Sequence, residues 1–174
     1  TPDIARGLGK KNLVGVKALQ LAVSNGQEVQ YNDWDGSYFA TTRAAAARAY
    51  KEAGISDPRK QVSMFEVHDC FSITELVTME DLGISAEGKA INDVLDGFYD
   101  ASGKVPCQID GGLKCFGHPI GASGLRMLYE MYLQLNGRAG ERQRADPVLG
   151  MTHNLGGFPS QNVSSITIVG AYGA

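Results

Sequence analysis

Apolar residues recur along the chain in runs and spacings typical of an alternating series of strands and helices. Runs of strand length, rich in Val, Ile, Leu and Met, occupy residues 13–24, 62–67, 148–152 and 163–169. Helical spacing or good helix formers occupy residues 43–53, 73–82, 90–98 and 122–135. Because strands and helices alternate and a short turn joins the last two strands, the pattern predicts an α/β fold, a mixed β-sheet covered by helices.

Polar residues and glycines mark the expected ends of the helices. Thr41 and Thr42 precede the alanine-rich run as candidate N-caps, and Gly54 ends it. Ser72 and Glu75 have the spacing of a capping box. The helix expected at residues 122–135 is predicted to carry one apolar face, formed by Leu125, Leu128, Tyr129, Tyr132 and Leu135.

The ends and loops of the chain divide it simply. Residues 1–12 are polar and are expected to form a connector or arm, and residues 13–174 a single domain. Residues 27–40 carry Trp34 and other aromatic side chains among Asp and Gly, which indicates an irregular loop. The segment 153–157 is predicted to be a turn, because it contains Asn and two adjacent glycines.

Composition excludes several functional classes. The 174 residues are 43% hydrophobic and 20% charged, as in soluble globular proteins, and the net charge of −3 argues against a nucleic-acid surface. No apolar stretch reaches membrane-spanning length. An odd count of three cysteines does not indicate a disulfide framework and favours a reducing, cytoplasmic location. The C-terminus is not a peroxisomal Ser-Lys-Leu signal, and the Thr1 start is compatible with processing or with a piece of a longer protein.

The glycine-rich stretch 111–124 contains His118-Pro119 and leads into the helix expected at residues 122–135. Glycines permit positive φ and close approach, and Pro119 restricts both itself and His118. The stretch is therefore expected to hold one imidazole at a defined place before the positive end of a helix.

The three histidines are expected near one edge of the sheet. His68, His118 and His153 follow predicted strands or lie in glycine-rich turns, and α/β folds bind ligands beyond the carboxyl ends of their strands. A single histidine at such a position is as often a packing residue. Cys70, two residues after His68 and at the start of a helix, has the setting of a nucleophilic or proton-carrying thiol, whereas Cys107 and Cys115 are expected to pack.

Metal and phosphate sites are weaker interpretations of the same residues. His68-x-Cys70 and Cys115-x-x-His118 could supply zinc ligands, completed by His153 or Cys107. Paired Cys-x₂₋₄-Cys units are missing, however, and a metal site does not explain the glycines. The glycine-rich stretch also lacks the Gly-Lys-Ser/Thr ending of a P-loop.

Three motifs together resemble the C-terminal half of thiolases. They are His68-Asp69-Cys70-Phe71, Gly117-His118-Pro119 and His153-Asn154-Leu155-Gly156. The resemblance is nearest to sterol-carrier-protein-type and related archaeal and bacterial acetyl-CoA acetyltransferases, and it runs from about residue 13 to residue 170. It implies a thiolase-like C-terminal domain acting in Claisen condensation or thiolytic cleavage of 3-ketoacyl-CoA. The nucleophilic cysteine of such enzymes lies in an N-terminal half that these residues do not include.

The resemblance implies a catalytic role for each motif. His118 matches the histidine that activates the nucleophile, and His68 the one that donates to the enolate oxygen of the second substrate. Cys70 matches the acid/base cysteine, which moves the α-proton. The N–H of Gly156 is expected to complete an oxyanion hole. Asn154 stands where more familiar thiolases carry a cysteine, so the proton transfer is left to Cys70.

The same resemblance implies how substrate binds. Phe71 is expected to line the pantetheine channel, and Gly117 to bind substrate beside His118. Phe158 replaces a smaller residue and is expected to reshape the acyl pocket or meet a partner. Coenzyme A thioester is the expected substrate, with no tightly bound cofactor and no metal.

The expected partners are an N-terminal thiolase half and a second copy in a homodimer. Two alternatives keep the fold. One is a CoA-thioester aldolase acting with a zinc-ribbon/OB-fold protein, and the other is a non-catalytic thiolase-like subunit.

Overall fold

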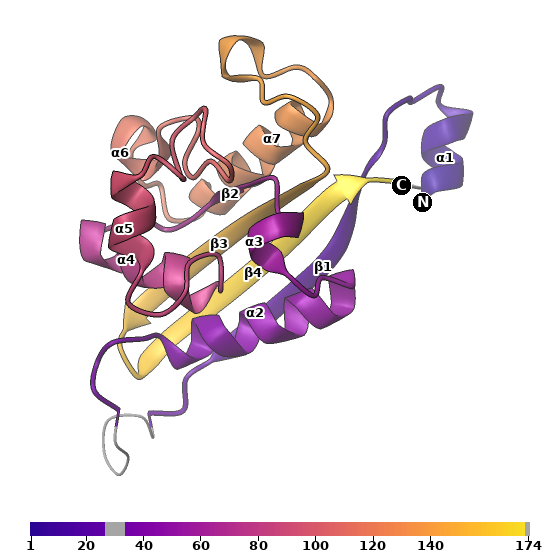
Figure 1. The fold of residues 1–174 in the computed structure, drawn as a ribbon. Coiled ribbons are helices and arrows are strands. Elements are labelled where there is room, and N and C mark those ends of the chain that lie inside the picture. Colours follow the sequence, from indigo (N-terminus) through magenta and orange to yellow (C-terminus); the bar gives the residue numbers. More distant parts are fainter. Residues whose placement is uncertain (27–33, 173–174) are drawn as a thin grey trace.

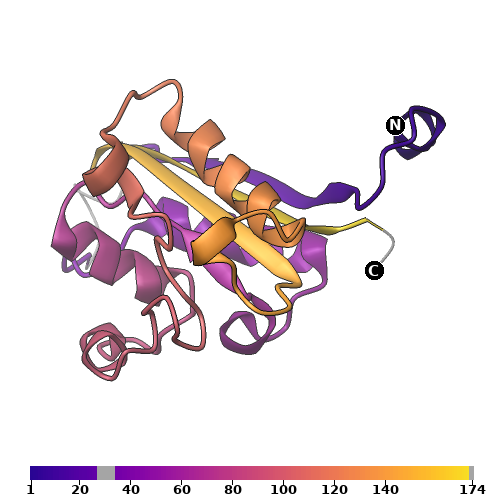
Figure 2. The ribbon, with the colours of Figure 1, turned by 90° about the horizontal axis from the view of Figure 1, so that it is seen from above.

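The computed structural model describes residues 1–26 and 34–172, which form three layers with a sheet in the middle (Figures 1 and 2). The strands are β1 (Val14–Val23), β2 (Met64–Glu66), β3 (Leu149–Phe158) and β4 (Gln161–Ala171). The helices are α1 (Pro2–Gly7), α2 (Ala40–Ala53), α3 (Pro58–Gln61), α4 (Ser72–Asp81), α5 (Ala90–Leu95), α6 (Gly112–Phe116), α7 (Ser123–Leu135) and the 3-10 helix η2 (Gly140–Arg142). The predicted α/β class is confirmed. Residues 27–33 of the expected aromatic loop lie outside the described residues.

The sheet is mixed and has the order β1-β4-β3-β2. β4 pairs antiparallel with both β1 and β3, and β2 runs parallel to β3 with Glu66 beside Thr152. The parallel pair brings the carboxyl end of β2 to the middle of the longer β3. Beyond Thr152, the β3 edge that faces away from β4 has no strand partner among the described residues.

Helices cover both faces of the sheet, and each face has its own core. α2 packs on one face and α7 on the other (Figure 2). On the α2 side, Phe65, Met151 and Ile166 are buried with the small alanines of α2. On the α7 side, Met64 and Met131 are buried, beside Val169. These apolar contacts fix the position of α7 relative to β2. Both elements border the predicted site.

The predicted N-caps of two helices are wrong, because each helix begins earlier in the sequence than predicted. α2 begins at Ala40 after Phe39, so Thr41 and Thr42 lie inside its first turn and are buried. Their hydroxyls bond to Asn162 and His153 instead of capping. α4 likewise begins at Ser72 after Phe71, with no side-chain cap.

The predicted apolar face of α7 meets the core only in part. Leu128 and Leu135 are half-buried against the core on this side, whereas Leu125 and Tyr129 are 68% and 61% exposed. The fully buried residues of the helix include Met127, Glu130, Met131 and Gln134. The two polar side chains can be buried because Arg142 pairs with Glu130 and backbone groups near Arg142 satisfy Gln134.

The predicted turn at 153–157 is instead the continuation of β3. Every residue from Leu149 to Phe158 pairs with β4, and the turn follows at 159–160. Gly157 has a φ of 102°, and a Cβ there would lie 2.3 Å from the carbonyl oxygen of Gln161. Glycine at this position therefore fits the tight end of a hairpin.

Two further helices differ from the sequence-based expectation. The arm at residues 1–12 contains α1, which lies apart from the three layers (Figure 1). The glycine-rich stretch contains the one-turn helix α6 before it reaches His118.

Candidate active site

His68 is held at the point where the chain leaves β2. Gln108 brackets the preceding residue, since its Nε2 donates to the Val67 carbonyl at 2.7 Å and its Oε1 accepts from the Val67 N–H at 3.4 Å. Asp69 Oδ1 accepts from the Leu113 N–H at 3.1 Å, which ties the turn after His68 to α6. The imidazole is therefore positioned by backbone contacts on both sides.

His118 comes to His68 from the other side, on the loop between α6 and α7. The centroids of the two rings lie 4.9 Å apart, with the planes tilted by 43°. The Nδ1 atom of His118 lies 2.7 Å from Ser123 Oγ, in the first turn of α7. The structure thus places together the two histidines that the sequence had singled out.

Asn154 lies on β3 beside the start of α7. A Cβ on Gly124 would lie 3.3 Å from Asn154 Nδ2, so the glycine gives the helix a close approach to β3. Because β2 and β3 are parallel with Glu66 beside Thr152, His68 leaves the sheet at the level of Asn154. Gly156 follows in β3 and is exposed, with no atom within 4 Å of the place where a Cβ would be. Gly117 is also exposed, at the end of α6.

An apolar cavity of about 390 Å³ adjoins His68 and Cys70. Phe71 and Phe158, two of the predicted substrate-binding residues, line it. The rest of its wall consists of Trp34, Gly36, Phe39, Ile73, Thr74, Val77, Leu155, Gly157 and Pro159. Phe71 and Phe158 are 68% and 80% exposed, so they form the mouth of the cavity. His118, Asn154, Gly117 and Gly156 are not among the lining residues.

Burial lowers the pKa of two of the three histidines. Burial lowers the pKa of His68, and His118 lowers it further, while Asp69 opposes the shift. Burial lowers the pKa of His153 to about 3. His153 lies within β3, fully buried, with its Nε2 3.0 Å from the Thr42 hydroxyl. The expectation that it stands in a turn at the sheet edge is wrong, because β3 continues through it.

A buried cluster of charged side chains, which no sequence motif predicts, connects the elements that carry His68 and His118. Arg126 of α7 bonds to Glu66 at 2.9 Å and also contacts Asp110. Burial, together with Asp110 nearby, raises the pKa of Glu66 to about 9. The cluster joins β2, the loop before α6 and α7, and so links the elements that carry His68 and His118.

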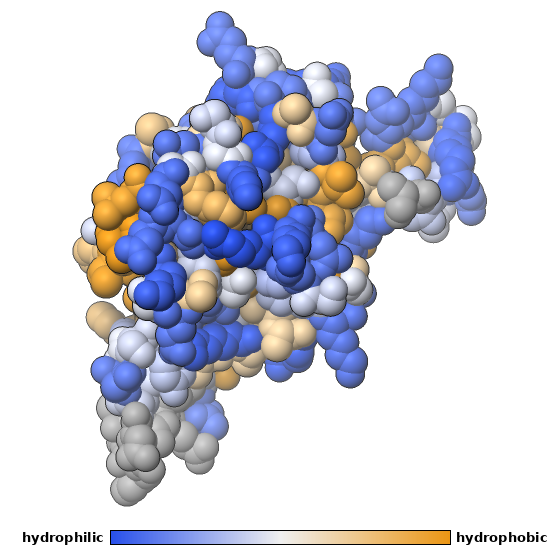
Figure 3. Space-filling view, viewed as in Figure 1, coloured by the Kyte–Doolittle hydropathy of each residue, from blue (hydrophilic) through white to orange (hydrophobic). Residues whose placement is uncertain are grey.

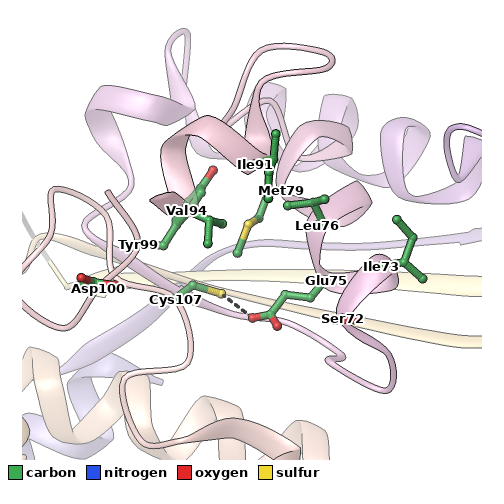
Figure 4. Close-up of a pocket in the computed structure, with 10 residues that line it drawn as sticks. All are labelled: Ser72, Ile73, Glu75, Leu76, Met79, Ile91, Val94, Tyr99, Asp100 and Cys107. Carbon is green, nitrogen blue, oxygen red and sulfur yellow. Dashed lines mark hydrogen bonds between the residues drawn. The ribbon is translucent and has the colours of Figure 1, made fainter. Parts of the chain in front are cut away.

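The other two cysteines lie outside the cavity. Cys107 lines a second cavity of about 470 Å³ between α4 and α5, where its thiol donates to Glu75 at 3.6 Å (Figure 4). Burial raises the pKa of this thiol, as expected for a packing residue. Cys115 is exposed, so the expectation that it packs is wrong.

The part of the chain that the structure describes meets neither the requirements of a metal site nor those of a membrane-spanning helix. Among the described residues, no group of three or more His, Cys, Asp and Glu side chains could hold a metal ion. Within the same ranges, no helix is long and apolar enough to cross a membrane.

The likeness of this chain to known proteins concerns its family and its fold. A family model described as thiolase C-terminal domain-like matches residues 22–168. An acetyl-CoA acetyltransferase of Methanothermobacter thermautotrophicus is 42% identical over 113 residues, 65% of this chain and 29% of that protein. Sterol carrier protein 2 of Homo sapiens is 38% identical over 118 residues, 68% of this chain and 21% of that protein. The matched part of the chain therefore spans less than a third of either relative.

A solved structure has the same fold. The Ltp2-ChsH2(DUF35) aldolase matches with a TM-score of 0.75 over 93% of this chain and 40% of that one. The sequence identity is 17%, so this likeness concerns the fold alone.

Proposed function

This chain belongs to the family of thiolase C-terminal domains, and we propose that it is the C-terminal catalytic half of a thiolase-like acyl-CoA acyltransferase. The observation that supports the proposal most directly is the pair of imidazoles of His68, after β2, and His118, before α7. Their ring centroids lie 4.9 Å apart. Two imidazoles with their centroids this close can act on one reacting group. The thiol of Cys70 follows two residues after His68, on the wall of an apolar cavity.

The chemistry needs such a set of groups. An α-proton next to a thioester is only weakly acidic, so removing it requires a base and a donor for the enolate oxygen. In the proposed mechanism the Cys70 sulfur takes the α-proton of the second acyl-CoA, and a neutral His68 donates an N–H to its enolate oxygen. Because burial and the neighbouring His118 lower the pKa of His68, the imidazole stays neutral at neutral pH and can serve as this donor.

A second donor is available on β3. The unpaired edge of β3 beyond Thr152 carries N–H groups that no strand takes among the described residues. Gly156 pairs with Val163 of β4, so the N–H groups on this open edge belong to its neighbours Leu155 and Gly157. We assign the oxyanion role to this edge, for which the loss of one donor typically costs about 2.7–4 kcal/mol of barrier.

The apolar surface of the chain supports an N-terminal half as the partner. Ala18 and Ala22 of β1 are buried in the α2-side core, so the neighbouring Leu19, Leu21 and Val23 point to the face that carries α7. These three side chains are 59–65% exposed. Leu125 and Tyr129 of α7 are exposed as well. We call these five apolar residues the α7-side surface, and exposed apolar areas mark protein contacts.

A reconstituted enzyme tests the function. The chain would be produced with an N-terminal half that carries the nucleophilic cysteine, and cleavage of acetoacetyl-CoA by free CoA would be followed. We expect Cys70→Ala and His118→Ala each to lower kcat by at least about 100-fold, the lower range for loss of a general acid or base. Cys115→Ala removes an exposed thiol outside the cavity and is the matched control.

The assay also separates the alternatives. Turnover that survives both Cys70→Ala and His118→Ala would contradict the assignment. The same preparations would be offered a β-hydroxyacyl-CoA, since release of an aldehyde or ketone without thiolysis would show aldolase chemistry. Failure of both reactions would favour a non-catalytic subunit.

A further inference from the structure

We infer that Ser123 fixes the tautomer of His118, so that Nδ1 carries the proton and Nε2 is the atom that takes a proton from the nucleophilic thiol. The inference rests on the proposed function for its consequence, but the tautomer itself is a property of this chain. Ser123 does not touch the reacting atoms in this scheme, so it is a positioning residue.

The hydrogen bonds of one hydroxyl decide the assignment. Ser123 Oγ lies 2.7 Å from His118 Nδ1 and 3.2 Å from the Pro119 carbonyl oxygen. A carbonyl can only accept, so the single hydroxyl proton of Ser123 points to Pro119 if both contacts are hydrogen bonds. Oγ then accepts from His118, and Nδ1 must bear the proton. In the opposite tautomer the hydroxyl would donate its proton to Nδ1. Ser123 Oγ and the Pro119 carbonyl oxygen would then lie 3.2 Å apart with no proton between them.

The position of the hydroxyl leaves little room for another arrangement. Ser123 is 2% exposed, so water does not replace the lost partner. Its backbone N–H donates to the same Pro119 carbonyl at 3.0 Å, which fixes the residue at the start of α7. Behind it, Gly124 packs against Asn154, so the first turn of the helix cannot withdraw from β3 without opening that contact.

The tautomer determines what His118 can do. With Nδ1–H donated to Ser123, the lone pair of Nε2 is free on the far side of the ring. The S–H bond of the thiol breaks as its proton moves to Nε2, and the sulfur keeps the electron pair as a thiolate that attacks the thioester carbon. The imidazolium that forms retains its bond from Nδ1 to Ser123. An isolated neutral imidazole prefers the other tautomer, in which Nε2 is protonated and cannot act as the base.

The tautomer can be measured directly. The protein with its N-terminal half present would be labelled with ¹⁵N-histidine, and two-bond ¹H–¹⁵N correlation spectra would distinguish the protonated from the unprotonated ring nitrogen. The His118 signals are identified by their loss in His118→Gln. We expect a protonated Nδ1 and an unprotonated Nε2 in the wild type, and a shift toward Nε2–H in Ser123→Ala.

Two variants keep the test interpretable. Ser123→Thr retains a hydroxyl and should restore the wild-type tautomer. Ser85→Ala removes another buried hydroxyl, which bonds to Asp93 and Tyr99, and should leave the His118 signals unchanged. Unshifted His68 and His153 signals in Ser123→Ala would show that the fold is intact.

The kinetic consequence is a loss in kcat with little change in KM. An Asp-to-Asn change that leaves the catalytic histidine of a serine protease in the wrong tautomer lowers kcat by about 10⁴-fold. A neutral hydroxyl imposes a weaker preference than a carboxylate, so we expect a loss of roughly 10- to 100-fold in Ser123→Ala and near wild-type kcat in Ser123→Thr.

The outcomes are distinct. An Nε2–H tautomer in the wild type, or an unchanged Nδ1–H tautomer in Ser123→Ala, would overturn the inference. If the assembly shows no thiolysis at all, the proposed function fails, while the spectra still decide the tautomer.

Discussion

Glu66 offers a sharp test of the electrostatics behind the site. The residue is fully buried two positions before His68, in contact with Arg126 and close to Asp110. Two carboxyl groups beside one guanidinium cannot both be ionised without leaving an excess buried charge. Burial and Asp110 accordingly raise the pKa of Glu66 from 4.5 to about 9 in the folded protein. We therefore expect Glu66 to be protonated at pH 7 when folded and ionised when unfolded.

The sign and size of the effect follow from linkage. Because the folded-state pKa is raised, the contribution of Glu66 to stability is fully present below the unfolded pKa and is lost as the pH rises toward about 9. Each pH unit in that window costs about 1.4 kcal/mol. Glu66→Gln keeps the shape and does not titrate. The stability of the wild type relative to this variant should thus fall by about 3 kcal/mol between pH 5 and pH 7.

Urea denaturation at a series of pH values, followed by circular dichroism, measures this difference. Subtracting the two curves cancels the titration of groups common to both proteins. Glu141→Gln, at an exposed carboxyl, serves as a control whose difference from the wild type should stay within about 0.5 kcal/mol across the range. A pH-independent gap between wild type and Glu66→Gln would refute the reasoning and would mean that Glu66 is ionised as the partner of Arg126.

Three further predictions address the fold and the partner surface. Met131→Ala, which empties a fully buried position between α7 and the sheet, should lower the free energy of unfolding by about 2–5 kcal/mol in urea denaturation. Gly112→Ala should lower turnover of the reconstituted enzyme at least about 10-fold, because φ is 61° and a Cβ would lie 2.8 Å from Asp69 Oδ2; Gly121→Ala, in open space, should not. Tyr129→Asp should abolish co-purification with the N-terminal half while the circular dichroism spectrum stays the same; retained association would contradict the role of the α7-side surface.

Local motifs predicted the site better than periodicity predicted the packing. The sequence predicts that His68 and His118 lie close together, because His68 follows a strand and His118 precedes a helix. Pro119 and the glycines beside His118 restrict its backbone, so local backbone geometry is enough for this prediction. The contacts that hold them, from Gln108, Asp69 and Ser123, join segments far apart in the sequence and leave no spacing to read.

The apolar face of α7 shows the limit of the pattern. Spacing identifies which residues share a face of a helix, but not which face meets the core. Buried Glu130 and Gln134 are tolerated only because Arg142 and the backbone near it satisfy them. Apolar side chains of α4 and α5 are also exposed, and they contribute to an apolar patch on the surface (Figure 3); they include Ile73, Ile91, Val94 and Leu95.

The sequence pattern predicts β3 too short for a related reason. Two adjacent glycines and an asparagine favour a turn locally, yet antiparallel pairing of every residue with β4 outweighs that preference. The longer strand places His153 in the core and pairs Gly156 with Val163 of β4.

The most direct test of the central claim follows the α-proton itself. The protein with its N-terminal half would be incubated with acetyl-CoA in D₂O, and deuterium in the acetyl methyl group would be measured by mass spectrometry. If Cys70 is the acid/base group, the wild type and Cys115→Ala will exchange the methyl protons, while Cys70→Ala will not. Exchange at an undiminished rate in Cys70→Ala would contradict the proposal that this thiol moves the proton.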